Sequence, residues 1–348
     1  MSERQLGFDT LQIHAGAHPD PATGARQVPI YQTTAYAFRD ADHAAKLFNL
    51  EEVGYIYSRL TNPTVSALAE RITHLEGGVG GICCSSGHAA QIMALFPLMM
   101  PGCNIVASTR LYGGSYTQLT HTIKRFGWSA RLVDFDDLDA VRAAVDDNTR
   151  AIFCESIANP GGYITDLDAI GELANDVGLP LIVDNTSATP YLCRPIEHGA
   201  TLVVNSTTKY LTGNGTVTGG AIVDSGKFDW AASGKFPSLA SPEAAYHGLN
   251  FYEALGGMAF TFHSIAVGLR DLGMTMNPQG AHYTLMGIET LSLRMDKHVA
   301  NAQIVANWLE NDPRIEKVTY AGLKSSPYYD RIERICPKGA GALFTFAI

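Results

Sequence analysis

The stretch LVVNSTTKYLTGNGTVTGGAIV, residues 202–223, joins two short apolar runs through a segment that carries one lysine among hydroxyl residues and glycines. The apolar runs at its two ends have the length and composition of strands that are buried on both faces. Between them, Ser206 and Thr208 flank Lys209, and the glycines that follow allow sharp turns. A surface lysine needs no such setting, which suggests that Lys209 reacts or lies beside an anion.

Apolar runs of the same kind precede this stretch, and helical patterns separate them. They are residues 81–84, 104–107, 130–133, 151–154 and 181–183. One of the separating helices is predicted to begin at Asn62-Pro63-Thr64, because proline is favoured in the first helical turn. Buried strands that alternate with amphipathic helices predict an α/β fold with a mostly parallel central sheet and helices on both faces.

The segments on either side of this region have a different texture. Residues 1 to about 60 are rich in Pro, Gly, Tyr and Thr, and we expect them to be irregular apart from a helical patch near 40–50. From about residue 250 the pattern turns helical. Leu291, Met295, Val299, Ala302, Val305 and Leu309 recur at helical spacing, and Pro313 ends that helix.

This texture divides the chain into three parts. We predict an N-terminal arm over 1–60 that contacts a neighbouring subunit, an α/β domain over 61–260 and a smaller α+β domain over 261–348. The last residues, GALFTFAI, have the pattern of a buried strand. Because termini usually lie in exposed polar segments, we expect further C-terminal sequence to be missing and the last domain to be incomplete.

Composition excludes several classes of protein. The formal net charge of −9 disfavours nucleic acid and anionic membranes as partners, because both attract Lys and Arg. The N-terminus has no apolar signal core, and the longest apolar run is too short to cross a bilayer. Six cysteines without a C-x-x-C spacing suit a reducing cytoplasm, where we place the protein.

Chemically useful residues follow four of the apolar runs. Ser85-Ser86-Gly87-His88 has the composition of an anion-binding turn at a helix start. Glu155 follows the run 151–154, and Asp184 follows the run 181–183. Lys209 follows the fourth. Taken singly, Ser86-Gly87 and Asp184 are also compatible with helix caps and Lys209 with a solvated loop. Ligands bind at the carboxyl ends of the strands in such sheets, which favours one shared site.

Pyridoxal 5'-phosphate explains the set. This cofactor needs a lysine for its aldehyde, a carboxylate against its ring nitrogen and donors for its phosphate. Lys209, Asp184, and the turn at Gly87 together with Ser206 and Thr208 have these properties.

Other motifs are absent. G-x-G-x-x-G is not completed after Gly213, no glycine–lysine pair forms a P-loop, and there is no G-x-S-x-G. His14 and His18 are poorly placed for a metal, so we predict no metal site.

From about Gln12 to Ile348 the sequence resembles the Cys/Met-metabolism pyridoxal-phosphate enzymes of fold type I. Their motifs are matched by Tyr57-Ser58-Arg59, Asn62-Pro63-Thr64, Ser85-Ser86-Gly87, Tyr112-Gly113-Gly114, Glu155 with Asn159-Pro160, Val183-Asp184-Asn185-Thr186 and Ser206-Thr207-Thr208-Lys209. Within this family it is most similar to the O-acetylhomoserine sulfhydrylase branch, in stretches such as Gly234-Lys235-Phe236-Pro237 and 287–295.

The resemblance implies roles for particular residues. Lys209 would bind the cofactor aldehyde and carry protons, and Tyr112 would stack on the ring and assist proton transfer. The remaining cofactor-binding residues implied are Tyr57, Arg59, Ser86, Gly87, His88, Asn159, Asp184, Thr186, Ser206 and Thr208. Of these, Tyr57 and Arg59 would reach the phosphate of a neighbouring subunit, which makes a dimer the catalytic unit and implies a tetramer.

The implied activity is γ-replacement. O-acetyl-L-homoserine and sulfide, or a thiol, would give L-homocysteine, or methionine, and acetate, as in methionine biosynthesis. The acetyl preference over succinyl rests on the resemblance. The alternatives are a methionine γ-lyase or cystathionine γ-synthase type of reaction, and a non-catalytic fragment that only binds the cofactor. The γ-lyases usually carry Cys where this chain has Gly114, which disfavours that alternative.

Two departures from the family pattern stand out. His88 occupies a position where Met is common, which is harmless if only the backbone N–H acts. The family's arginine for the substrate α-carboxylate lies in a stretch that would follow Ile348.

Overall fold

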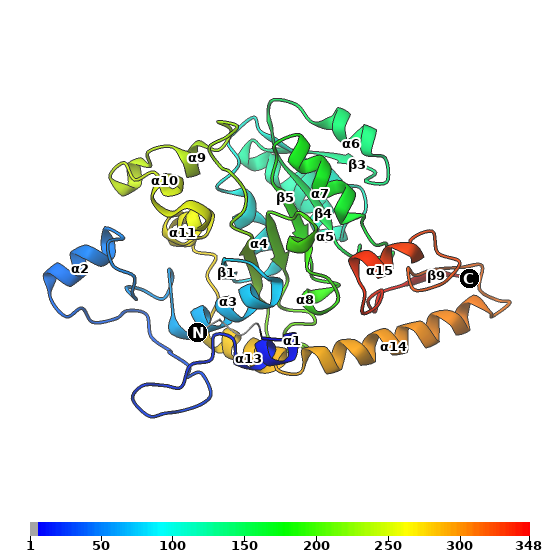
Figure 1. Ribbon diagram of the computed structural model, residues 1–348, viewed down its shortest axis with the longest axis horizontal. Coiled ribbons are helices and arrows are strands. Elements are labelled where there is room, and N and C mark those ends of the chain that lie inside the picture. The colour runs from blue at the N-terminus through cyan, green and yellow to red at the C-terminus, as the bar shows by residue number, and fades with distance from the viewer. Residues whose placement is uncertain (1–5) are drawn as a thin grey trace.

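The fold is built on a seven-stranded sheet in the order β1-β7-β6-β5-β4-β2-β3 (Figure 1). The computed structural model describes residues 6–348. The strands of the large sheet are β1 Gly80–Cys84, β2 Asn104–Ser108, β3 Ser129–Val133, β4 Thr149–Glu155, β5 Leu181–Asp184, β6 Leu202–Asn205 and β7 Gly220–Asp224. β7 runs antiparallel to both of its neighbours, and the other pairs are parallel. The predicted α/β class with a mostly parallel sheet is confirmed.

Helices surround this sheet and form most of the rest of the chain. They are α1 Phe8–His14, α2 Ala41–Phe48, α3 Pro63–Glu76, α4 Gly87–Leu95, α5 Gly113–Thr117, α6 Leu138–Ala144, α7 Leu167–Asp176, α8 Thr189–Leu192, α9 Pro237–Ala240, α10 Phe251–Leu255, α11 Ala259–His263, α12 Arg270–Leu272, α13 Pro278–Ile288, α14 Leu291–Glu310 and α15 Ile332–Ile335. Asn62 caps α3 as predicted, with its side chain accepting the Thr64 N–H.

Two hydrophobic cores lie on the two faces of the sheet, because successive strand residues point to opposite sides. In β4, Ile152 and Cys154 join one core, whereas Ala151 and Phe153 join the other. Residues of α3, α7 and α13 pack on the first face. Residues of α4 and α11 pack on the second. The predicted burial on both faces is confirmed for the other strands of this sheet, but it is wrong for β3, an edge strand whose residues are exposed or half-buried.

The antiparallel direction of β7 follows from the connection that precedes it. A parallel neighbour requires a crossover, usually a helix packed on one face of the sheet. Between β6 and β7 the chain makes only turns, so it returns along the edge of β6 in the opposite direction. The lysine segment therefore lies as a loop at the carboxyl end of β6.

Two sequence-based expectations are wrong in detail. The arm contains α1 in addition to α2, because Gln12 is buried and donates its Nε2 to Ser292 Oγ at 2.9 Å. Val305 of α14 is 43% exposed, and Ala306 is buried in its place. An α-helix advances 3.6 residues per turn, so the buried stripe moves by one position along this long helix.

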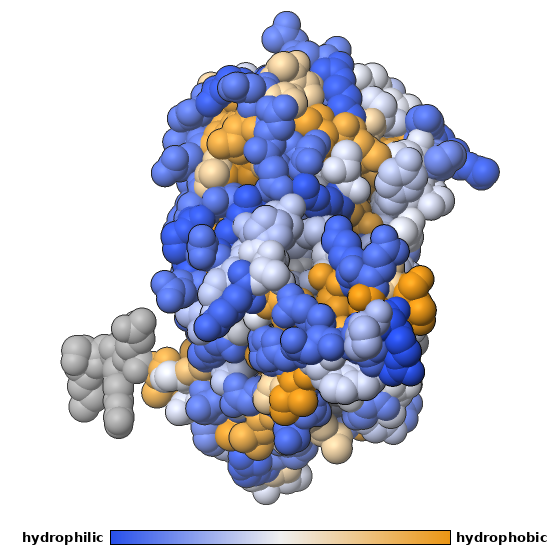
Figure 2. All heavy atoms as spheres, turned by 90° about the vertical axis from the view of Figure 1, so that its right-hand side faces the viewer, coloured by the Kyte–Doolittle hydropathy of each residue, from blue (hydrophilic) through white to orange (hydrophobic). Residues whose placement is uncertain are grey.

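The C-terminal strand is also more exposed than predicted. β8 Lys317–Thr319 and β9 Thr345–Ala347 form a two-stranded antiparallel sheet, and all three residues of β9 are exposed. Figure 2 shows the side of the molecule on which α14 and β9 end in Figure 1, with hydrophobic patches among hydrophilic ones. Exposed apolar side chains in these elements include Ile304, Trp308 and Phe346. The boundaries of the three predicted parts stay predictions.

Within residues 6–348, none of the helices combines the length and the apolar composition that a bilayer crossing requires.

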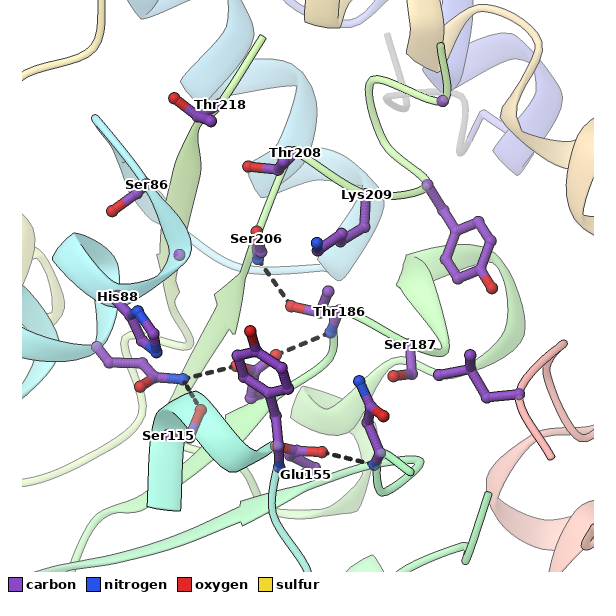
Figure 3. Close-up of a pocket in the computed structure, with 18 of the residues that line it drawn as sticks. Ser86, His88, Ser115, Glu155, Thr186, Ser187, Ser206, Thr208, Lys209 and Thr218 are labelled. Carbon is purple, nitrogen blue, oxygen red and sulfur yellow. Dashed lines mark hydrogen bonds between the residues drawn. The ribbon is translucent and has the colours of Figure 1, made fainter. Parts of the chain in front are cut away.

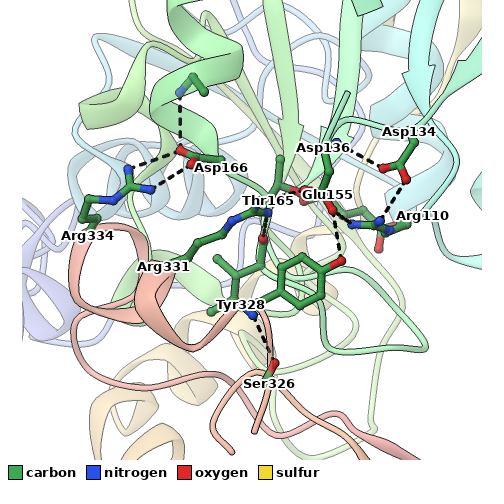
Figure 4. A network of polar contacts seen from close by, with 12 residues as sticks. Arg110, Asp134, Asp136, Glu155, Thr165, Asp166, Ser326, Tyr328, Arg331 and Arg334 are labelled. Carbon is green, nitrogen blue, oxygen red and sulfur yellow. Dashed lines mark hydrogen bonds and ion pairs between the residues drawn. The ribbon is translucent and has the colours of Figure 1, made fainter. Parts of the chain in front are cut away.

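A polar network joins the α/β region to the segment after β8 (Figure 4). Asp136 accepts hydrogen bonds from Arg110 Nη1 at 2.6 Å, Arg331 Nη2 at 2.8 Å and Tyr328 Oη at 3.0 Å. Arg331 also donates its Nη1 to the Ile164 carbonyl at 2.8 Å. Burial tends to raise the pKa of Asp136, but the bonds from the two arginines outweigh burial and lower it.

We expect Asp136→Asn to lower the free energy of unfolding by roughly 1 kcal/mol, because it weakens two charged hydrogen bonds at a partly exposed site. A lowered carboxyl pKa stabilises the fold above the unfolded-state pKa, about 4, and this contribution is lost as pH falls through the folded-state pKa. The difference from the wild type is therefore constant at neutral pH and shrinks below about pH 4. Urea unfolding at several pH values measures it.

Asp147→Asn, at an exposed aspartate outside the network, is the matched control. Equal losses in the two variants would contradict a role of the network in stability.

Candidate functional site

A cavity of about 590 Å³ opens at the carboxyl ends of β4, β5 and β6 (Figure 3). Of the predicted site residues, those that line it are Ser86, Gly87, His88, Tyr112, Asn159, Asp184, Thr186, Ser206, Thr208 and Lys209. Parallel strands bring their carboxyl ends to one edge, which is why residues far apart in the sequence meet here. Figure 3 shows the Lys209 side chain pointing into this cavity between Thr208 and Thr186.

The first turn of α4 forms one wall. Ser86 caps the helix by accepting the Ala89 N–H at 3.1 Å. A Cβ on Gly87 would lie 2.6 Å from the Ser206 Cβ, so only glycine lets the helix start this close to the end of β6. The first N–H groups of a helix lack partners within the helix, and they attract anions. Ser206 and Thr208 lie beside them in the same cavity.

Asp184 forms the floor. Its buried carboxylate accepts the Thr186 N–H at 3.0 Å and Gln91 Nε2 at 3.0 Å. The same Gln91 Nε2 donates to Ser115 Oγ at 2.8 Å, which fixes the direction of the amide. Burial raises the pKa of Asp184, so a positively charged group beside the carboxylate would stabilise its ionised form.

Glu155 is a second buried carboxylate in the same cavity. It accepts the Tyr112 N–H at 2.6 Å and the Asn159 N–H at 2.9 Å, and thereby positions both residues. Burial, with Asp184 nearby, raises the pKa of Glu155. Its position after a buried strand was noticed in the sequence, but its role in holding Tyr112 and Asn159 was not.

The loop after β6 is held by hydroxyl groups. The Ser206 N–H donates to Thr186 Oγ1 at 2.7 Å, which links the ends of β6 and β5. Thr208 Oγ1 accepts the Gly219 N–H at 3.0 Å and donates to the Gly219 carbonyl at 3.1 Å. Lys209 is exposed to the cavity rather than packed in a core.

Tyr57 and Arg59 lie elsewhere. Both line a separate cavity of about 650 Å³, together with residues 275–278. Arg59 donates its Nη1 to the Arg270 carbonyl at 2.8 Å. Within one subunit the structure therefore does not bring these two residues to Lys209.

The residues around Lys209 fit pyridoxal phosphate. Asp184 and Glu155 are buried side by side, and within residues 6–348 neither forms an ion pair with a lysine or arginine. A protonated ring nitrogen would supply the missing positive charge. The helix start at Gly87 and the neighbouring hydroxyls supply phosphate donors. Over the described part of the chain, no group of three or more His, Cys, Asp or Glu side chains could hold a metal ion.

Several lining residues were absent from the sequence-based prediction. They are Gln91, Ser115, Ser187, Tyr210, Gly213, Gly215, Thr218, His298 and Leu343. Glu155 also lines the cavity, and the sequence analysis placed it at a strand end of the shared site without assigning it a role. Gln91 and Ser115 lie on helices, and their direction toward Asp184 depends on how those helices pack. His298 and Leu343 come from the C-terminal region.

Comparisons with known proteins agree with this geometry. Residues 9–348 match the family model described as Cys/Met metabolism PLP-dependent enzyme. A homocysteine synthase of Schizosaccharomyces pombe is 46% identical over 97% of this chain and 80% of its own length. An O-acetyl-L-homoserine sulfhydrylase of Corynebacterium glutamicum is 48% identical over 99% of this chain and 80% of its own length.

A solved structure is also similar. The putative O-acetylhomoserine (thiol)-lyase of Campylobacter jejuni, which contains a pyridoxyl-lysine monophosphate, superposes with a TM-score of 0.95 at 40% identity. The alignment covers 98% of this chain and 83% of that one. The near-complete family match, the two relatives and the shared fold establish that this chain belongs to the Cys/Met metabolism PLP-dependent enzymes.

Proposed function

We propose that this chain is a pyridoxal-phosphate-dependent transferase that converts O-acetyl-L-homoserine and sulfide, or a thiol, to L-homocysteine, or methionine, and acetate. The observation that carries the proposal is the cavity in which Lys209 faces a buried aspartate and a helix start. The relatives named as O-acetyl-L-homoserine sulfhydrylases, at 43% and 48% identity, support the choice of substrate.

The residues on each wall of the cavity would contact a different part of the cofactor. Asp184 would face the ring nitrogen, Tyr112 the ring, and Gly87, His88, Ser206 and Thr208 the phosphate. When bound, pyridoxal phosphate supplies an electron sink that stabilises negative charge on the substrate carbon.

The protein's own groups move the protons. Lys209 Nζ would take the proton from the substrate α carbon and return it later, because it is the lysine that points into the cavity. Asp184 must stay ionised although burial favours its protonated form. The hydrogen bonds from Gln91 and the Thr186 N–H favour the ionised form. Glu155 holds Tyr112 and Asn159 at the wall of the cavity.

His88, Tyr112 and Gly114 form one packed unit beside this cavity. The rings of His88 and Tyr112 are stacked with centroids 6.0 Å apart. A Cβ on Gly114 would lie 2.5 Å from Tyr112 Cε1 and 2.7 Å from His88 Cε1. The two rings therefore occupy the space that a side chain at position 114 would need. A γ-lyase with Cys at this position would have to arrange its tyrosine differently.

We further propose a dimer as the catalytic unit, and a tetramer as its assembly. Tyr57 and Arg59 lie away from the Lys209 cavity of their own subunit. The arm that carries them exposes apolar side chains, with Phe48 58% and Val53 84% exposed. A second subunit would cover these side chains. The six free, buried cysteines support a reducing, cytoplasmic location.

Lys209→Ala is expected to reduce turnover of O-acetylhomoserine with sulfide by more than about 1,000-fold, because it removes the proton carrier. Homocysteine and acetate formation are measured by chromatography. Lys227→Ala, at an exposed lysine after β7, should retain wild-type turnover. Normal turnover in the Lys209 variant would refute the proposed mechanism. Formation of 2-oxobutyrate by the wild type without sulfide would favour a γ-lyase instead.

Gly114→Ala is expected to lower kcat/KM about 10-fold or more, because the new Cβ displaces the Tyr112 ring. Gly113→Ala is the matched control, since its Cβ would meet no atom within 4 Å. Adding His88→Ala to Gly114→Ala should recover part of the activity by making room for the ring to return. Equal effects at the two glycines would contradict the packing argument.

Mixing inactive variants tests the shared site. Lys209→Ala and Arg59→Ala subunits, dissociated and reassembled together, should regain about a quarter of wild-type activity, since half the dimers would contain one intact site of two. Each variant alone should stay low. No gain on mixing would show that Arg59 serves its own subunit or neither.

A further inference from the structure

A buried carboxylate lies behind the cavity. Glu76, the last residue of α3, is completely buried. It accepts hydrogen bonds from Asn185 Nδ2 at 3.1 Å and 3.2 Å and from Asn205 Nδ2 at 2.7 Å. Both asparagines are buried as well. Nothing in the proposed reaction uses this group, although a buried carboxylate is costly to maintain.

Each asparagine is the chain neighbour of a residue that lines the cavity. Asn185 follows Asp184 at the end of β5, and Asn205 precedes Ser206 at the end of β6. Neighbouring residues in a strand point to opposite sides. While Asp184 and Ser206 line the cavity, their neighbours meet at Glu76. The carboxylate thus bonds two strand ends to each other from behind.

A third strand end joins this cluster through Asn185. Ser156, which follows Glu155, donates its Oγ to Asn185 Oδ1 at 2.7 Å and its N–H to the Asp184 carbonyl at 3.0 Å. Asn185 Nδ2 also donates to the Cys193 carbonyl at 2.9 Å. Both ends of the Asn185 amide are therefore engaged. The ends of β4, β5 and β6 are held in one hydrogen-bonded cluster.

The side-chain amide of Asn205 depends on Glu76 more strongly than the amide of Asn185 does. Its Nδ2 donates to Glu76, while its buried Oδ1 has no partner within the described residues. Replacing the Glu76 carboxylate by a group that cannot accept this bond would leave the Asn205 amide free to turn. The residue that follows it, Ser206, begins the loop that carries Lys209.

We propose that Glu76 is a positioning residue, which sets Asp184 and the Ser206–Lys209 loop at the mutual distance that pyridoxal phosphate requires. The inference rests on the proposed function of the cavity. Three cofactor contacts depend on this distance, namely those of the ring nitrogen, the phosphate and the aldehyde. The residues proposed for them at the ends of β5 and β6 are linked on the cavity side by the Ser206 N–H to Thr186 Oγ1 bond and on the far side by Glu76.

A second buried carboxylate gives a matched control. Asp224 at the end of β7 is 1% exposed and accepts the Gly226 N–H at 2.9 Å. Burial raises the pKa of Asp224 and of Glu76 alike, to about 7. Asp224 pairs with Leu202 at the start of β6, so it lies at the end of the sheet away from the cavity. Asp224→Asn therefore tests the loss of a buried carboxylate without changing the hydrogen bonds at the ends of β4, β5 and β6.

The experiment compares Glu76→Gln with Asp224→Asn. Glutamine keeps the shape of Glu76 but turns one acceptor into a donor that faces the asparagine amides. The dissociation constant for pyridoxal phosphate is measured by titrating cofactor-free protein and recording visible absorption. Urea midpoints and kcat and KM for O-acetylhomoserine are measured alongside.

We expect Glu76→Gln to weaken cofactor binding and to lower kcat, each about 10-fold or more, with a smaller change in KM. Asp224→Asn should leave all three at wild-type values while lowering the urea midpoint. If both variants lose only stability, Glu76 is merely structural and the inference is overturned. If the wild type itself does not bind pyridoxal phosphate, the proposed function fails, and this inference with it.

Asn205→Ala provides a second test, which stands if the Glu76 variant does not fold. It removes one arm of the cluster and should weaken cofactor binding several-fold. In the double variant with Glu76→Gln the losses should be less than multiplicative, because both changes break the same link. Wild-type affinity in Asn205→Ala, or independent effects in the double variant, would overturn the inference.

Discussion

Burial of the Asp184 carboxylate at the end of β5 is the constraint on which the rest of the site depends. An ionised carboxylate inside a protein is stable only with hydrogen bonds and a compensating charge. Gln91 and the Thr186 N–H supply the hydrogen bonds. In the proposed function, the ring nitrogen of pyridoxal phosphate would supply the compensating charge.

Glycines let the walls of the cavity pack closely against one another. Gly87 allows the start of α4 to approach Ser206, and Gly114 allows the rings of Tyr112 and His88 to stack. The antiparallel return of β7 leaves the Lys209 segment as a loop over the cavity. Behind these contacts, Glu76 accepts hydrogen bonds from Asn185 and Asn205, and Glu155 accepts the Tyr112 and Asn159 N–H groups. Two layers of polar contacts thus support a single wall of the cavity.

The C-terminal region contributes residues to the cavity and to the polar network around Asp136. His298 and Leu343 line the cavity, and the arginine–aspartate network around Asp136 holds Tyr328 and Arg331 against the α/β region. Arg110 belongs to this network and lies two residues before Tyr112. The ion pairs that attach the C-terminal segment therefore also hold the backbone segment that leads from Arg110 to Tyr112.

The sequence by itself determined the sheet strands, the cap of α3 and part of the lining of the Lys209 cavity, because burial periodicity and strand-end chemistry are local properties of the chain. Only the tertiary structure decided that α1 forms in the arm, that Val305 is exposed and that β9 is an exposed strand, since each depends on which distant surface packs there. The contacts of Gln91 with Asp184 and of Glu76 with Asn185 and Asn205 could not be predicted for the same reason. A hydrogen bond between residues about 100 positions apart leaves no periodic trace in the sequence, and it exists only once the strands have aligned.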